Sequence, residues 1–135
     1  MLDGLISVLE TVVAMQEAFA GLKASEDGQL DFSELFKFGI DNEGTNGYIA
    51  TADFKTAATR LLEMSKSSEE LKKALEQVKI NGDDIGTLLQ LAKDGYALDE
   101  TRAKALSAAM DAFYKASLSG NYDTDNIYES VKEVL

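Results

Sequence analysis

Residues 17–54, EAFAGLKASEDGQLDFSELFKFGIDNEGTNGYIATADF, differ in character from the rest of the chain. Four of the six phenylalanines lie between Phe19 and Phe38, and seven carboxylates accompany one basic residue from Glu26 to Asp53. The remainder of the chain has the apolar periodicity of amphipathic helices. We therefore expect any specific binding chemistry to lie in this segment.

Two turns in the segment carry a polar residue followed by glycine, with an acid six positions later. In residues 23–34 these are Asp27, Gly28 and Glu34. They match positions 5, 6 and 12 of a calcium loop, so this part of the chain resembles the EF-hand family, in which a helix enters and another leaves such a loop. Position 1 is Lys23, a cation that opposes a divalent ion. This first loop is therefore expected to be metal-free.

The second loop, residues 42–53, also resembles the EF-hand pattern, with Gly47 at position 6. The candidate calcium ligands are the side chains of Asn42, Asn46 and Asp53 and the backbone carbonyl of Tyr48. Gly28 and Gly47 are close in sequence, so residues 34–41 would have to serve as both the exiting and the entering helix. Two acidic turns followed by capped helices explain the same residues without a metal. Calcium stays the one cofactor that the sequence suggests.

Composition limits the function further. At 135 residues and 45% hydrophobic content, the chain is expected to form a single domain, 1–135, with a substantial core. It has no Cys and no His, so disulfides and thiol catalysis are excluded and the usual general base is missing. We therefore expect no enzymatic activity. The net charge of −11 disfavours direct contact with nucleic acid or anionic membranes and favours basic partners.

The first helix is predicted over residues 2–22 and is apolar on most sides, as in a central helix or a subunit interface. Asp3 stands where a signal peptide would be basic, and Glu10 and Glu17 interrupt the apolar run. The sequence thus predicts no signal peptide and no membrane span. The expected location is intracellular, in the cytoplasm or within a virion.

The remaining pattern predicts an all-α, compact bundle of about six or seven helices, with a degenerate EF-hand-like helix-loop-helix near the N-terminus. The predicted helices after the first cover residues 31–41, 51–65, 68–79, 84–93, 99–118 and 125–135. Thr51 is expected to cap one of them, a Ser67/Glu70 capping box another, and Asp83 or Asp84 a third. Asn81-Gly82 and Gly95 are expected to end helices. Short segments at 29–31 and 48–50 are the expected strands of a small ribbon.

The function expected from these features is that of a non-enzymatic structural or protein-interaction subunit, which packs as a homo-oligomer or within a larger complex. A virion or tail component would fit such a chain. The candidate interface residues are Leu2, Leu5, Leu9, Val12, Val131 and Leu135. Two alternatives stay open: a calcium-responsive EF-hand-like binding module, and an acidic inhibitor that imitates nucleic acid.

Overall fold

The computed structural model describes residues 32–119 and 123–133. These residues are mostly helical, but they also form two short antiparallel hairpins, so the expectation of a purely all-α fold is corrected. The helices are α2 (Phe32–Leu35), α3 (Ala52–Ser65), α4 (Glu69–Gln77), α5 (Ile85–Lys93), α6 (Glu100–Ser119) and α7 (Thr124–Lys132). The strands are β1 (Phe36–Ile40), β2 (Asn46–Ala50), β3 (Lys79–Ile80) and β4 (Asp83–Asp84).

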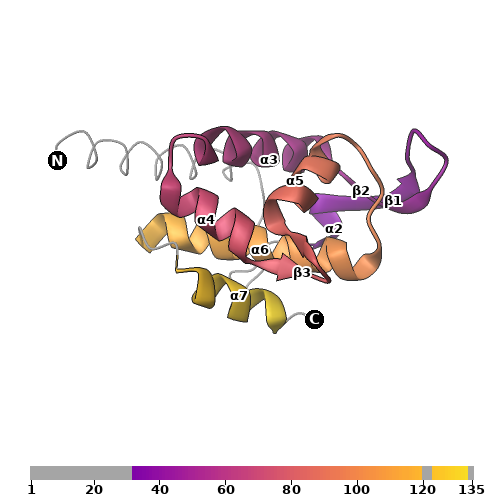
Figure 1. Cartoon of the computed structure of the whole chain (residues 1–135). Helices are drawn as coiled ribbons and strands as arrows, with labels where there is room; N and C mark the ends of the chain where they lie inside the picture. Colours follow the sequence, from indigo (N-terminus) through magenta and orange to yellow (C-terminus); the bar gives the residue numbers. More distant parts are fainter. Residues whose placement is uncertain (1–31, 120–122, 134–135) are drawn as a thin grey trace.

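The core lies between α3, α4, α5 and α6, and α7 packs on α6 and α4, below them in the view of Figure 1. Helix α6 places Ala105, Ala109 and Phe113 in this core, and its small residues let neighbouring helices approach closely. Helix α7 buries Ile127 and Val131 against the rest of the domain. The C-terminal helix therefore docks on its own chain.

Side-chain caps define where the helices begin. The Thr51 hydroxyl accepts a hydrogen bond from Phe54 N at 3.5 Å, and the Asp84 carboxylate accepts one from Thr87 N at 2.6 Å, as predicted. The cap of α4 is Ser68, whose hydroxyl accepts from Leu71 N, and the prediction of Ser67 was wrong by one residue. A Ser-Ser pair offers two hydroxyls, and the sequence pattern does not distinguish them.

The predicted helix over 68–79 ends earlier, at Gln77, because the chain turns back as a hairpin. Asn81 has φ 51° and Gly82 has φ 91°, the pair of positive values that a two-residue type I′ turn requires. Lys79 and Ile80 pair with Asp84 and Asp83 across this turn. Asn81-Gly82 therefore closes a hairpin instead of terminating a helix.

The predicted helix over 31–41 is also wrong beyond Leu35. From Phe36 the chain is a strand paired with β2, and Phe36 lies opposite Ala50. Residues 48–50 are in a strand as predicted, and they pair with 36–38. The other predicted strand, 29–31, lies outside the described residues. Figure 1 shows the turn of this hairpin extending beyond the helices, at the right of the view.

Candidate functional site

The turn of the β1–β2 hairpin is organised by Asp41. Its Oδ1 accepts hydrogen bonds from Glu43 N and Thr45 N, both at 2.9 Å, and its Oδ2 accepts one from Ala97 N at 3.3 Å. The hydrogen bond from Thr45, aided by those from Ala97, Glu43 and Gly44, holds the pKa of Asp41 below its ordinary value, although desolvation acts in the opposite direction. An ionised Asp41 therefore fixes the turn and ties it to the loop after α5.

The outer edge of β2 is attached to the same loop. Tyr48 N donates to the Leu98 carbonyl at 2.8 Å, and Leu98 N donates to the Tyr48 carbonyl at 2.9 Å. A Cβ at Gly47 would lie 2.8 Å from the Leu98 backbone oxygen, so only glycine permits this approach. Strand β2 is thus held between β1 and the loop.

The outer edge of β1 has a different environment. Because Tyr48 directs both backbone groups toward Leu98, the Phe38–Tyr48 pair is a non-hydrogen-bonded pair of the hairpin. The N–H and carbonyl groups of Phe38, and by alternation those of Ile40, consequently point away from β2. Among the residues that the structure describes, none pairs with these groups.

The side chains on this edge are apolar and exposed. Phe38 is 69% exposed and Ile40 is 67% exposed. The Phe38 ring contacts Tyr48 edge to face, with ring centroids 5.4 Å apart. At the inner end of the same strand, Phe36 is buried and its ring lies 4.8 Å from that of Phe54. The apolar face of β1 therefore begins in the core and continues into solvent.

The predicted calcium ligands of residues 42–53 fall on three different elements. Asn42 lies in the hairpin turn, Asn46 begins β2, and Asp53 lies in the first turn of α3. The Tyr48 carbonyl accepts the hydrogen bond from Leu98 N. No group of three or more carboxylates in the described part of the chain is placed to hold a metal ion. Calcium binding here stays a prediction.

Most of the predicted interface residues, Leu2, Leu5, Leu9, Val12 and Leu135, lie outside the described residues. The exception is Val131, which is 2% exposed. It faces the interior of its own chain, because α7 packs on α6 and α4. Val131 thus contributes to the core and offers no side-chain surface to another subunit.

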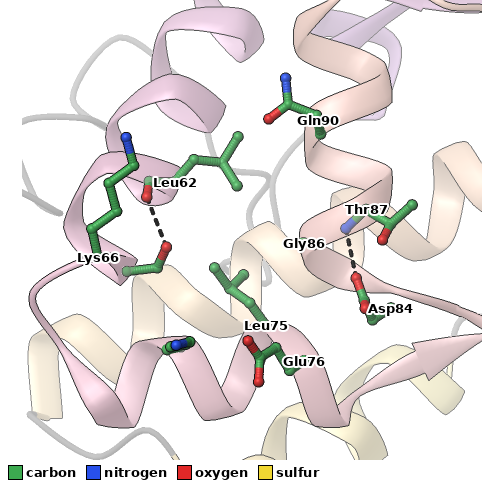
Figure 2. A pocket seen from close by; sticks show the side chains of 10 residues that line it. Leu62, Lys66, Leu75, Glu76, Asp84, Gly86, Thr87 and Gln90 are labelled. Atoms are coloured by element: carbon green, nitrogen blue, oxygen red, sulfur yellow. Dashed lines mark hydrogen bonds between the residues drawn. The ribbon is translucent and has the colours of Figure 1, made fainter.

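A pocket of about 560 Å³ opens between α3, α4 and the start of α5. Figure 2 shows Leu62 and Leu75 pointing into it, with Lys66, Glu76 and Asp84 at its margin. The Asp84 carboxylate is engaged by Thr87 N, and Lys66 pairs with Glu63 at 3.4 Å. Two of the charged groups at this margin, Asp84 and Lys66, are thus already engaged within the chain.

The sequence contained a signal for β1 that helical periodicity obscured. In FKFGI the apolar residues Phe36, Phe38 and Ile40 alternate with Lys37 and Gly39, the period of a half-buried strand. Asp41 to Thr45 then supply turn residues before a second β-forming segment. Alternation of this length, together with a helix-weakening glycine, is compatible with a strand as well as with a helix.

Comparison of the chain with protein-family models, curated proteins and solved structures finds no match. Among the described helices, none combines the length and apolar character needed to cross a membrane. The function of the chain is therefore inferred from the geometry of the β1–β2 hairpin.

Proposed function

We propose that this chain is a non-enzymatic protein-interaction subunit that contacts other protein subunits through the β1–β2 hairpin. The observation that carries the proposal is the outer edge of β1, where Phe38 and Ile40 expose both apolar side chains and backbone hydrogen-bonding groups. Natural proteins usually protect such edges with charge, proline or a covering segment, because an open edge pairs with other chains. An edge that combines both features fits a binding surface.

The rigidity of the hairpin supports the same proposal. Asp41 fixes the turn, and Tyr48 and Leu98 fix β2, so the exposed strand is held in one conformation before any partner arrives. Preorganisation of this kind reduces the entropy lost on association.

The test is a comparison of the wild-type chain with the double variant Phe38→Ser/Ile40→Ser in association measurements. Each protein is immobilised, and the retention of soluble chain and of other proteins is measured. We expect the double variant to lose at least tenfold in binding, because both apolar contacts are removed while the buried Phe36 is kept. A matched double variant at exposed polar positions of α4, Lys72→Ser/Lys73→Ser, should bind like wild type. Equal binding by the hairpin variant and wild type would overturn the proposal.

The calcium-responsive module and the nucleic-acid mimic stay predictions from the sequence. A melting curve recorded in chelator and in millimolar calcium tests the first. Salt-sensitive binding to a basic protein tests the second.

A further inference from the structure

We propose that β1 pairs antiparallel with β1 of a second copy of this chain, so that two hairpins join as one four-stranded sheet centred on Gly39. The inference rests on the proposed function, because it uses the same edge, and it specifies the partner. Three features support this register: the backbone groups of β1, the charges near it and its single glycine, Gly39.

The backbone groups of the edge match one another. Phe38 and Ile40 each present an N–H and a carbonyl away from β2. With Gly39 on the twofold axis, Phe38 of one copy lies opposite Ile40 of the other as a hydrogen-bonded pair. Each residue can then donate its N–H to the carbonyl of the residue opposite. The exposed side chains of these residues meet on one face of the new sheet and leave water.

The charges favour this register over the one centred on Phe38. Centring on Gly39 places Lys37 opposite Asp41 of the second copy, and the symmetry creates this opposite-charge pair twice. Centring on Phe38 would place Lys37 opposite Gly39 and Asp41 opposite Leu35, with no such pair. Since the chain carries a net charge of −11, two copies repel each other overall, so attraction has to come from a local match of this kind.

Gly39 occupies the position where the two backbones come closest. The backbone φ angle of Gly39 is not positive, so the conformation of the hairpin does not require a glycine at this position. A Cβ at this position would lie 3.4 Å from Ile49 Cδ1, within tolerable contact. On the axis, Gly39 faces its own copy in a non-hydrogen-bonded pair, where Cα atoms are about 4.5 Å apart. A glycine within a strand often marks such a close approach of another backbone.

A cysteine at the axis tests this geometry directly, because the natural chain has no Cys. The expected Cα separation of the Gly39 pair lies within the range that a disulfide spans. Gly39→Cys should therefore form a covalent dimer under mild oxidation, at least tenfold faster than Lys79→Cys, an exposed position on the other hairpin. Equal rates for the two variants would overturn the proposed register.

Light scattering after size exclusion provides the second test and does not depend on that variant. The wild-type chain should approach twice 14.6 kDa as its concentration rises. Ile40→Pro should remain monomeric, because proline removes the outward N–H while sparing the ladder to β2. Ile40→Val keeps that N–H and should still dimerise. Circular dichroism checks that each variant is folded.

The outcomes separate this inference from the function on which it rests. A wild-type monomer at every concentration would overturn the pairing of two copies. If the Phe38→Ser/Ile40→Ser variant then still loses binding to another protein, the hairpin remains the interaction surface and its occupant is a strand of that protein. A dimer that persists in Ile40→Pro would use another surface and would also overturn the inference.

Discussion

The hairpins β1–β2 and β3–β4 each close with a turn that contains a glycine of positive φ, at Gly44 and Gly82. Each also carries an isoleucine next to its turn, but their surroundings differ. Ile80 is 1% exposed, whereas Ile40 is 67% exposed. The strands of the short hairpin have two residues, and Ile80 belongs to the core. The strands of the long hairpin have five residues, and Ile40, at the end of β1, is exposed to solvent.

The difference shows how hairpin length separates buried from exposed apolar residues. Strand β3 adds one apolar side chain to the core and ends there. Strand β1 adds Phe36 to the core and then continues with Phe38 and Ile40, which contribute little to the core of a single chain. Burial removes apolar surface from water and stabilises the fold. Exposed apolar residues keep that free energy available for association.

The largest contrast is expected from truncating the two isoleucines. Ile80→Ala removes a buried side chain and should lower the free energy of unfolding by about 2–5 kcal/mol. Ile40→Ala should change it by less than about 0.5 kcal/mol in the monomer, because its side chain is exposed. Chemical denaturation of dilute samples measures both. Similar losses in the two variants would contradict the different roles given to the hairpins.

A second contrast concerns the attachment of β2 to its loop. Gly47→Ala places a methyl group against the Leu98 backbone oxygen and should destabilise the protein by about 1–3 kcal/mol. The control Gly86→Ala lies in α5, where the new Cβ meets ordinary contacts at 3.5 Å or more. It should be neutral or stabilising by up to about 1 kcal/mol. If Gly47→Ala unfolds no more easily than wild type, the loop is not held as described.

The β3–β4 hairpin is joined to α6 by an ion pair of Arg102. Removing Arg102 should change the stability less than Gly47→Ala does. Arg102 Nε lies 3.1 Å from Asp83, and its Nη1 lies 3.1 Å from Asp99. These carboxylates raise the pKa of Arg102, with the hydrogen bond to Asp99 contributing most. The pairs are partly exposed, so Arg102→Ala should lower the free energy of unfolding by at most about 1 kcal/mol.

The control for Arg102 is Lys104→Ala, which breaks the pair with Glu100 inside α6. Hydrogen exchange of residues 79–84 should accelerate in the Arg102 variant alone. Unchanged exchange there would show that β4 is held without the arginine.

The smallest expected effect is a local dependence on pH at the β1–β2 turn. The pKa of Asp41 is lower in the folded chain, so its contribution to stability is present at neutral pH. It is lost as the pH falls from the ordinary range of an aspartate through the lowered pKa. Hydrogen exchange at Glu43 and Thr45, whose amides donate to this carboxylate, should accelerate in that acidic window. Asp41→Asn should remove the pH dependence, and a wild-type turn indifferent to acid would contradict the assignment.

Local patterns in the sequence predicted most of the helical part of the fold. The apolar spacing of residues 51–65 and 84–93 and the caps Thr51 and Asp84 are confirmed. These features depend on contacts within one turn of helix, which is why they are legible in the sequence. The exact cap of α4 and the end of that helix were wrong, because the competing hydroxyls and the Asn81-Gly82 turn admit more than one local structure.

The sequence predicted which segment holds the candidate site, but not the secondary structure of that segment. The sequence directed attention to residues 17–54 and proposed metal ligands there, but it assigned 36–40 to a helix. Five residues with phenylalanine, isoleucine and glycine support either structure until a partner strand is known. The partner strand, β2, comes after a turn that Asp41 organises. That turn also depends on a hydrogen bond from Ala97 N to Asp41, 56 residues apart in sequence, which local patterns do not reveal.

The sequence by itself determined the acidic charge, the exclusion of Cys and His chemistry, and the amphipathic faces of the main helices. These properties depend on composition and on neighbours within a few residues. Tertiary structure alone decided that Ile80 is buried while Phe38 and Ile40 are exposed, and that one edge of β1 lacks a partner among the described residues. Burial and strand pairing depend on segments distant in sequence, since backbone hydrogen bonds between strands carry no local signature of their partner.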